Sequence, residues 1–438
     1  MVNIAKILYY LAAANRRLHW NKDQMEKYQG ERLRAVVRYA YEYVPYYHQL
    51  FKEAGVDADS IKQVADLAKL PVNKKSIFKS QPTQQTVSTQ FDINKMKKVR
   101  TSGSTGTPLQ VYINASEDVW RKSIYMRANI SCGQKARDRW VVLTSPTHFG
   151  DTTGIQRKLG IYAQTCVSLF ESTDSKIGQI EAARPDIIDG YSGSLVMLAK
   201  EVKRRGLKTI NPRLMFGNAE YIDDESRKYL QDVFNAPYCD QFGCAEVDRT
   251  AWQCLARNGY HMDADSVITE FLDKDGNPVS NGERGEVTYT SLFNFTMPII
   301  RYAIGDIGVP SGEACSCGVT LPMMKIIEGR RDSFIMLPGD RVVSPMVFNF
   351  ALSRFRYYTD IDKYKIHQRA MNYFEVQLKL HSTSIDQSQL VSELNSQLKS
   401  FLEIKGDEVC FNISVVDDIP LPKTGKLLSV TSDLKAEI

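Results

Sequence analysis

The amino-acid sequence predicts an α/β protein with a large N-terminal domain and a small α+β C-terminal domain. We expect mainly parallel sheets with helices in the large domain, followed by a β-rich subdomain. Apolar strands alternate with helices up to about residue 240, and short segments with Asp-Gly and Asn-Gly turns begin near residue 262. The length of 438 residues also exceeds what one hydrophobic core usually supports.

The first 60 residues have a mostly helical pattern, with a break expected near Val44 and Pro45, because a residue before proline avoids helical dihedral angles. The opening segment, MVNIAKILYYLAAANRR, resembles a weak signal peptide with a short apolar core, so secretion is a minor alternative. Its helical pattern continues into the following residues, so we interpret it as an amphipathic first helix. No run approaches the ~20 apolar residues that a membrane span needs.

The sequence pattern in the middle of the chain predicts alternating helices and strands. A helix is expected over residues 117–131, a buried strand over 140–144, and a short strand at Ile187 and Ile188 before another helix. The segment NPRLMFGNAE is expected to be a strand that ends in a polar loop. Such alternation is typical of a parallel sheet.

The sequence pattern of the last third of the chain predicts a different arrangement of strands. The segments VITEFLD, GERGEVTYTSL and MPIIRYAIGDIG suggest antiparallel strands. Two further strand-like segments, YKIHQRA and NYFEVQLKL, precede a helix over 387–402 and the segment VCFNISVVDDI. This α+β pattern could fold separately, with a boundary near residues 329–333.

The composition excludes some classes of function. Hydrophobic residues make up 43% and charged residues 24%, as in an ordinary globular protein, and the net charge of +5 is spread along the chain. Because no dense Lys/Arg block occurs, we expect no nucleic-acid binding. We expect no membrane partner either, because no apolar run is long enough to span a bilayer. Eight irregularly spaced cysteines suggest a reducing compartment, so the cytoplasm is the expected location.

The segment RTSGSTGTPLQVY places hydroxyl and glycine residues just before a strand. Glycines let backbone N–H groups approach an anion closely, so the segment is either a phosphate-binding loop or a plain turn. It is not a Walker motif, since Gly106 is followed by Thr107 and Pro108. The loop residues are Thr101, Ser102, Gly103, Ser104, Thr105, Gly106 and Thr107.

Five further motifs follow in order along the chain. They are FGNAE (216–220), QFGCAEV (241–247), RYAIGD (301–306), GRRD (329–332) and PKTGK (422–426). Together with the loop, they make the chain resemble the adenylate-forming superfamily of acyl-CoA synthetases and ligases. The likeness is strongest to its phenylacetate-CoA ligase branch, which includes CapK-like proteins and coenzyme F390 synthetases.

The resemblance implies ATP- and Mg²⁺-dependent adenylation of a carboxylic acid, followed by transfer of the acyl group to CoA. The loop would cradle the β- and γ-phosphates, Glu246 would hold Mg²⁺, and Lys426 would contact the carboxylate and the α-phosphate. Asp306 and Arg330 would contact the ribose. The other nucleotide-binding positions implied are Asn218, Ala219, Glu220, Gln241, Phe242 and Gly243. Lys423 is a neighbouring rival to Lys426.

The resemblance also implies a mobile C-terminal domain. The domains would be residues 1–328, which form the adenylation domain, and residues 333–438, which form a lid that carries Lys426. Residues 329–332 would be the hinge, with Asp332 as the hinge residue.

The acyl pocket is expected at the carboxyl ends of the strands. Its candidates are the residues beside the motifs: Tyr191, Phe216, Gly217, Ala219, Tyr238 and Phe242. His148, in a polar loop after a strand, is a weaker candidate. The aromatic lining would suit a small or aryl carboxylic acid.

Three cysteines and a histidine form a separate set of candidate metal ligands. Cys254, His261, Cys315 and Cys317 would supply the four ligands of a structural zinc, although buried free thiols explain the spacing equally well. Some phenylacetate-CoA ligase-like proteins carry a comparable zinc site. We interpret Cys132, Cys166, Cys239 and Cys410 as core residues.

Several departures leave the acceptor open. Phe242 replaces the usual Tyr of its motif, and Ser333 stands where a second Asp often follows the hinge. The segment SFIMLPGDRVVSP also places the chain nearer to the CapK-like relatives. One alternative is therefore an enzyme that transfers AMP or an acyl group to an acceptor other than CoA. Another is a non-catalytic, zinc-stabilised binding protein. The oligomeric state stays open and is compatible with a homodimer.

Overall fold

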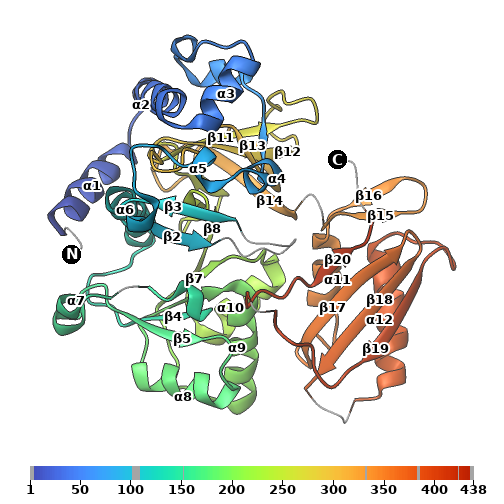
Figure 1. The fold of residues 1–438 in the computed structure, drawn as a ribbon. Helices are drawn as coiled ribbons and strands as arrows, with labels where there is room; N and C mark the ends of the chain where they lie inside the picture. The colour runs from blue at the N-terminus through green and yellow to red at the C-terminus, as the bar shows by residue number, and fades with distance from the viewer. Residues whose placement is uncertain are drawn as a thin grey trace. The chain divides into compact units, whose positions relative to one another are not determined.

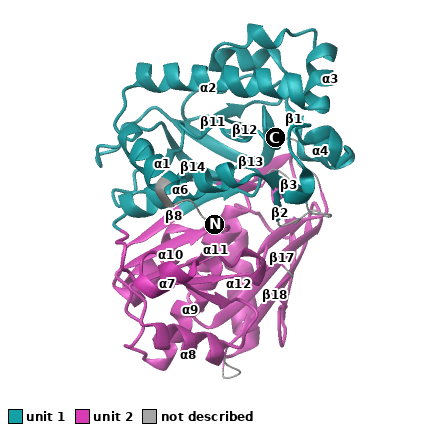
Figure 2. Ribbon diagram, turned by 60° about the vertical axis from the view of Figure 1, so that its left-hand side comes forward, with its two compact units in different colours: residues 1–133, 241–327 teal, residues 134–240, 328–438 magenta. Residues whose placement is uncertain are grey.

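The fold was analysed in a computed structural model, which describes residues 4–100, 109–150, 152–330, 333–381, 385–422 and 424–434. The chain forms two compact units, shown in Figure 2. Unit 1 comprises Met1–Gly133 and Gln241–Ile327, and unit 2 comprises Gln134–Asp240 and Glu328–Ile438. The α/β class predicted from the sequence, with a C-terminal α+β portion, is confirmed. The boundaries predicted at 328 and 333 stay a prediction.

The helical start of unit 1 follows the predicted pattern. It contains α1 (Ile4–Arg17), α2 (Lys22–Tyr43) and α3 (Pro45–Glu53). Val44 adopts an extended conformation between α2 and α3, and Pro45 occupies the first turn of α3, where its missing N–H is no loss. The predicted break is therefore confirmed, and a new helix begins directly after it.

After α3, unit 1 continues with short elements, a β-hairpin and a longer helix. The short elements β1 (Asn73–Lys74), α4 (Lys75–Ser80) and α5 (Thr83–Thr86) precede a hairpin of β2 (Lys97–Arg100) and β3 (Gln110–Ile113). The helix predicted at 117–131 is α6 (Ala115–Ser131). Asn114 caps it by accepting hydrogen bonds from the backbone of Ser116 and Glu117.

The predicted antiparallel region lies in the same unit. Its strands are β9 (Asp248–Trp252), β10 (Tyr260–Met262), β11 (Val267–Leu272), β12 (Gly285–Ser291), β13 (Tyr302–Ser311) and β14 (Met323–Arg330). β11 pairs with β12 and β12 with β13, both antiparallel, as expected. β10 lies antiparallel between β9 and β14, and β8 (Tyr238–Cys244) pairs with β9 through its last residues. Val287, Tyr289, Ile299 and Tyr302 lie in the core of this unit.

The parallel strands belong to unit 2. They are β4 (Trp140–Thr144), β5 (Gln164–Ser168), β6 (Ile187–Tyr191) and β7 (Leu214–Asn218), which are neighbours in the order β7-β6-β4-β5. All three pairings are parallel, as the alternation predicted. The helices of this part are α7 (Gly154–Leu159), α8 (Thr173–Ala183), α9 (Ser192–Arg205) and α10 (Asp224–Phe234).

The C-terminal part of unit 2 is the α+β segment (Figure 1). It contains β15 (Ile335–Leu337), β16 (Arg341–Val343), α11 (Met346–Ser353), β17 (Ile361–Ala370), β18 (Tyr373–Leu380), α12 (Gln387–Phe401), β19 (Cys410–Val415) and β20 (Val430–Ser432). Its main sheet has the order β19-β18-β17-β20. Leu390, Leu394 and Leu398 of α12 pack on this sheet in a core of their own.

Two of the four cysteines assigned to the core are placed differently. Cys132 and Cys239 are buried, but Cys166 is half-buried and Cys410 is exposed. Cys410 begins β19, an edge strand whose residues alternate between the core and solvent. The core assignment of Cys410 was therefore wrong, because a small apolar side chain does not reveal which face of a strand it occupies.

Candidate active site and metal centre

The lysine of the PKTGK motif lies among three predicted site residues in unit 2. Lys426 Nζ is 5.6 Å from the centroid of the Tyr191 ring, and its charge affects the pKa values of His148 and Glu220. These residues come from four separate segments: the loop before β20, the end of β6, the turn after β4 and the turn after β7. The fold thus brings together residues that the sequence separates by up to 278 positions.

Glu220 links the lysine loop to helix α9. Its Oε2 accepts a hydrogen bond from the Gly193 amide at 2.9 Å, in the first turn of α9, where backbone N–H groups favour an anion. Its Oε1 accepts a second bond from the Leu427 amide at 3.2 Å. Burial raises the pKa of this carboxyl to about 7, while Lys426 and the two amides act in the opposite direction.

The turn that carries Glu220 is tight. The Glu220 amide donates to the Asn218 carbonyl at 2.8 Å, and Ala219 between them has a φ of 68°. A non-glycine residue in this region of φ is uncommon and tends to occur at functional sites. The turn directs the Glu220 carboxylate toward α9. The side-chain amide of Asn218 donates to Asp189 Oδ1 at 2.9 Å.

His148 and Tyr191 form one polar pair beside Lys426. A hydrogen bond of 2.8 Å joins His148 Nδ1 and the Tyr191 hydroxyl. Burial, assisted by the charge of Lys426, lowers the pKa of His148, so the imidazole is neutral at neutral pH. Tyr191 ends β6 and is nearly fully buried.

Glycines allow the close approaches in this region. Gly425 has a φ of 76°, and a Cβ on it would lie 2.8 Å from Leu169 Cδ1. Only glycine combines that backbone conformation with that packing. A Cβ at Gly217 would overlap the Tyr238 ring, whose hydroxyl contacts Ser192 Oγ at 2.9 Å. Phe216 and Tyr238, two acyl-pocket candidates, are fully buried.

The second predicted catalytic residue, Glu246, lies in unit 1. Its buried carboxylate Oε1 is 3.2 Å from Lys75 Nζ and 3.0 Å from the Tyr302 hydroxyl. Its main-chain carbonyl accepts bonds from Arg121 at 2.6 Å and from Asn294 at 3.0 Å. Both the backbone and the carboxylate of Glu246 are therefore held. None of these partners was expected from the sequence.

The other predicted nucleotide residues are distributed around this segment. Gln241 is buried and donates to Asn129 Oδ1 at 2.7 Å, while Phe242 packs against the core of unit 1. Gly243 is pressed against the backbone of Asp248. Desolvation raises the pKa of the Cys244 thiol, and the charges of Glu246 and of Asp306, on β13, raise it further, so both carboxylates lie near that sulfur.

Some predicted positions are outside the described residues. These are the whole loop from Thr101 to Thr107, the hinge residue Asp332, and Lys423. Arg330 ends β14 and is half-buried. Its carbonyl accepts a 2.7 Å hydrogen bond from the hydroxyl of Ser333, the residue that departs from the usual motif.

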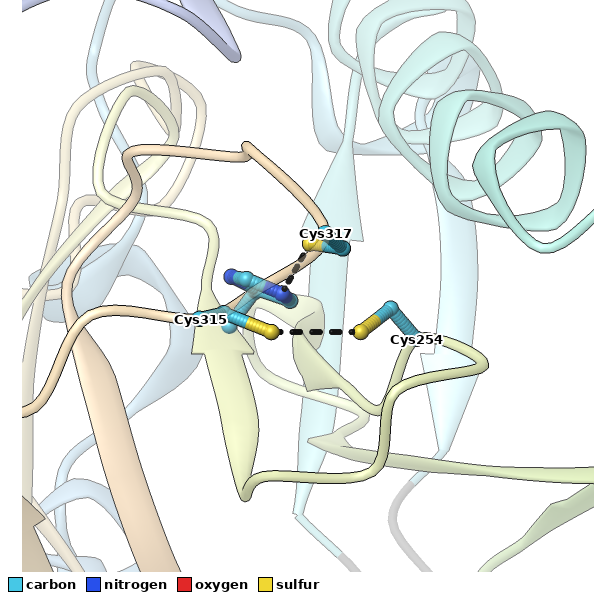
Figure 3. A group of neighbouring side chains, drawn as sticks. Cys254, Cys315 and Cys317 are labelled. Carbon is cyan, nitrogen blue, oxygen red and sulfur yellow. Dashed lines mark hydrogen bonds between the residues drawn. The ribbon is translucent and has the colours of Figure 1, made fainter.

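The four predicted zinc ligands lie together in unit 1 (Figure 3). The ligand atoms of Cys254, His261, Cys315 and Cys317 are all within 4.8 Å of one another. Cys254 Sγ is 3.5 Å from Cys315 Sγ, and Cys317 Sγ is 3.3 Å from His261 Nε2. Three thiols and one imidazole are the donor set of a closed tetrahedral zinc site.

The strands explain how distant ligands meet. Cys254 follows β9 and His261 is the middle residue of β10, which pairs with β9. Cys315 and Cys317 belong to the connection from β13 to β14, and β14 is the other neighbour of β10. The connection also contacts the turn after α1, because Thr320 Oγ1 donates to the Leu18 and Trp20 carbonyls.

Within the described part of the chain, no helix combines the length and apolar character that crossing a bilayer requires. No protein-family model matches the sequence.

Comparison with known proteins gives several similarities. A phenylacetate-coenzyme A ligase of Thermus thermophilus is 26% identical over 340 residues, which are 74% of this chain and 75% of that protein. Protein CapK of Staphylococcus aureus is 23% identical over 427 residues, 93% of this chain and 89% of CapK. A crystal structure of 2-hydroxyisobutyryl-CoA ligase in the postadenylation state has the same fold, with a TM-score of 0.79 and 19% identity over 95% of this chain and 91% of that one.

The chain has the fold of a class of α/β enzymes that combine a mixed sheet with a C-terminal α+β segment. In sequence the chain is similar to phenylacetate-coenzyme A ligases, and in fold it is similar to 2-hydroxyisobutyryl-CoA ligase. The resemblance to the adenylate-forming superfamily noted in the sequence is confirmed.

Proposed function

We propose that this protein is a ligase that adenylates a small carboxylic acid and transfers the acyl group to CoA. In the first step, a carboxylate oxygen of the acid attacks the α-phosphorus of ATP, and the bond to the β-phosphate oxygen breaks. The products are an acyl-adenylate and pyrophosphate. In the second step, the CoA thiolate attacks the acyl carbonyl, AMP leaves, and a thioester forms.

The arrangement around Lys426 carries this proposal. An ammonium group, a buried aromatic ring, a neutral imidazole and a carboxylate with a raised pKa converge at the ends of β6 and β7. Ligands of open parallel sheets bind at this edge, where the carboxyl ends of the strands meet. Perturbed titratable groups are typical of functional sites.

Within this site, each residue has a distinct task. Lys426 would stabilise the negative charge that develops between the acid and the α-phosphate in the transition state. Because His148 is neutral, it can donate or accept a hydrogen bond to the acid without adding a second positive charge. Glu220 would hold the lysine loop by its contact with the Leu427 amide. Adenylation needs no side-chain nucleophile, so positioning and electrostatics supply the catalysis.

Mg²⁺ would be held at Glu246. This cation prefers oxygen ligands and usually keeps several waters and phosphate oxygens, so one protein carboxylate is sufficient. The buried Glu246 carboxylate fits that requirement, although it is already in contact with Lys75 and Tyr302. When bound, Mg²⁺ would neutralise part of the phosphate charge.

The Cys/His cluster would hold a structural zinc ion. Its ligand set leaves no position for substrate, which is the usual difference between structural and catalytic zinc sites. Unpaired thiols at Cys254, Cys315 and Cys317 would be maintained in a reducing compartment, which is consistent with the expected cytoplasmic location.

The choice of acid and of acyl acceptor rests on the similar proteins. The phenylacetate-CoA ligase relatives favour an aryl or other small carboxylic acid and CoA. The similarity to CapK over 93% of the chain favours a second candidate, an enzyme that adenylates and then uses an acceptor other than CoA.

A pyrophosphate-release assay tests the proposal. The purified protein is incubated with ATP, Mg²⁺ and a panel of aryl, short-chain and hydroxy acids, with and without CoA. We expect release that depends on one class of acid and on Mg²⁺, and a CoA thioester detected by mass spectrometry. Release without a thioester would favour the second candidate. ATP binding without release for any acid would indicate a binding protein.

The pH dependence of stability tests the environment of Glu220. Its pKa is raised from 4.5 to about 7 on folding, so the folded state retains the proton longer. The associated stability is therefore present below about pH 4.5 and is lost as pH rises through about 7. Relative to Glu220→Gln, which does not titrate, the wild type should lose about 2 kcal/mol of unfolding free energy between pH 5.5 and 8.

The measurement is denaturant unfolding of both proteins at the two pH values. Glu171→Gln serves as the control, since Glu171 is also in unit 2 but lies in the loop before α8. An unfolding free-energy difference between wild type and Glu220→Gln that does not change with pH would show that Glu220 titrates normally.

A further inference from the structure

A buried lysine outside the site described above contacts the C-terminal segment. Lys200, on α9, is 7% exposed, and its Nζ donates to the main-chain carbonyls of Tyr358 and Ile361, both at 2.7 Å. The same nitrogen lies 3.8 Å from the centroid of the Tyr358 ring. A lysine ammonium over an aromatic face gains further attraction when it is shielded from water.

Burying this cation is unfavourable in itself. Burial lowers the pKa of Lys200 to about 8, although Asp362 and Asp360 act in the opposite direction. A position that required only packing would be filled by an apolar residue at lower cost. The two carbonyls, by contrast, need a donor, and a lysine reaches both at once.

The segment held by Lys200 makes a second contact nearby. The Tyr358 hydroxyl lies 2.7 Å from Ser226 Oγ, on α10, and Ser226 Oγ also donates to Asp223 Oδ2 at 2.7 Å. Tyr229, also on α10, meets the Tyr358 ring edge-on. Tyr358 is therefore held at its carbonyl by α9 and at its hydroxyl by α10.

Strand pairing connects Ile361, which Lys200 holds, to the loop before β20 that carries Lys426. Ile361 is the first residue of β17, and β17 pairs in parallel with β20, with Ile366 opposite Val430. The Ile366 amide donates to the Ser429 carbonyl at 2.7 Å. Ser429 is three residues after Lys426. Between Lys426 and Ser429, the Leu427 amide donates to Glu220.

We propose that Lys200 is a positioning residue for Lys426, which anchors the start of β17 so that β20 and the loop before it present Lys426 at the ends of β6 and β7. This inference rests on the adenylation function proposed above. It predicts a specific effect on the half-reaction that needs Lys426 beside the acid, and little effect on the transfer of an acyl group from a preformed adenylate.

The test compares Lys200→Met with Lys203→Met. Methionine keeps the length of the buried stem but leaves the two carbonyls without a donor. Lys203 is an exposed lysine one turn further along the same helix. We expect Lys200→Met to lower kcat for acid-dependent pyrophosphate release on the order of 10–100-fold, with a small change in the KM for ATP, because a misplaced catalytic group costs this much. Thioester formation from a synthetic acyl-adenylate and CoA should change less than about twofold.

A second readout does not require activity. Hydrogen exchange should become faster at the Leu427 and Ile366 amides in Lys200→Met, and stay unchanged in Lys203→Met, because the first variant loosens the lysine loop. Tyr358→Phe, which removes only the hydroxyl contact with Ser226, should give a smaller increase at the same amides. It serves in place of Lys200→Met if that variant does not fold.

The outcomes separate the two proposals. If the wild type releases no pyrophosphate with any acid but the Leu427 amide is deprotected in Lys200→Met, the adenylation function is wrong and the anchor stands. If the wild type is active and Lys200→Met impairs both half-reactions equally, or neither, the positioning role is wrong. Unchanged exchange at Leu427 and Ile366 also contradicts it.

Discussion

Replacing Lys426 with alanine is expected to lower acid-dependent pyrophosphate release by about 10²–10³-fold, the usual effect of removing one group that stabilises transition-state charge. The ammonium group lies over the Tyr191 ring and close enough to Glu220 and His148 to influence both pKa values. Among the described site residues at the ends of β4, β6 and β7 and in the loop before β20, Lys426 is the one with a lysine or arginine side chain. The loss should therefore appear in kcat and in kcat/KM alike.

Lys423→Ala is the matched control, because Lys423 is the neighbouring lysine of the same PKTGK motif. We expect it to retain most of the activity. Thermal unfolding of both variants should match the wild type, which would exclude loss of fold as the cause. Equal activity of Lys426→Ala and wild type, or a larger loss for Lys423→Ala, would show that Lys426 has been assigned the wrong role.

Removal of the metal is expected to have the largest effect on stability. We expect the protein to contain one zinc ion per chain, and its extraction by a chelator to lower the melting temperature by roughly 10–20 °C. This estimate assumes a loss of about 5 kcal/mol, well below the binding free energy of structural zinc in small peptides. The ligands connect β9, β10 and the segment before β14, so their release would loosen several strands of unit 1.

Cys315→Ser should reproduce the effect of the chelator, while Cys410→Ser should leave zinc content and melting temperature unchanged. Cys410 is a suitable control because it is exposed and lies on β19, in the other unit. Zinc content is measured by elemental analysis and stability by calorimetry. A wild-type protein without zinc that melts like its chelated form would contradict the site and leave the cluster as a group of reduced thiols.

The sequence predicted the helices and strands that depend on short-range signals such as helix caps and prolines. The helix at 117–131 was expected, and α6 covers residues 115–131, because the side chain of Asn114 caps the first turn. The break at Val44 and Pro45 was expected from the dihedral preferences of proline and is confirmed. The parallel strands at β4, β6 and β7 follow from apolar segments between helices.

The sequence was less informative about contacts between distant residues. Nothing in the segment LPVNKKSI, residues 70–77, indicates that Lys75, rather than Lys74, forms an ion pair with Glu246. Lys200 belongs to a helix with several lysines and arginines, so its burial could not be predicted from the pattern. The polar character of a side chain predicts exposure, and only packing can override that preference.

Glu220 illustrates the same limit within a motif. The sequence placed it in FGNAE and assigned it to the nucleotide. The structure joins its carboxylate to the Gly193 and Leu427 amides. Its sequence neighbours do not encode these bonds, because one partner lies 27 residues before it and the other 207 residues after it.

The sequence by itself determined the kinds of chemical group available, their order, and the helices and strands that carry them. These depend on residue type and short-range periodicity. Only the tertiary structure decided which groups meet: Lys426 with Tyr191 and Glu220, Cys254 and His261 with Cys315 and Cys317, and Lys200 with the start of β17. These contacts between distant residues depend on strand order and on the burial of charge, which are properties of the whole fold.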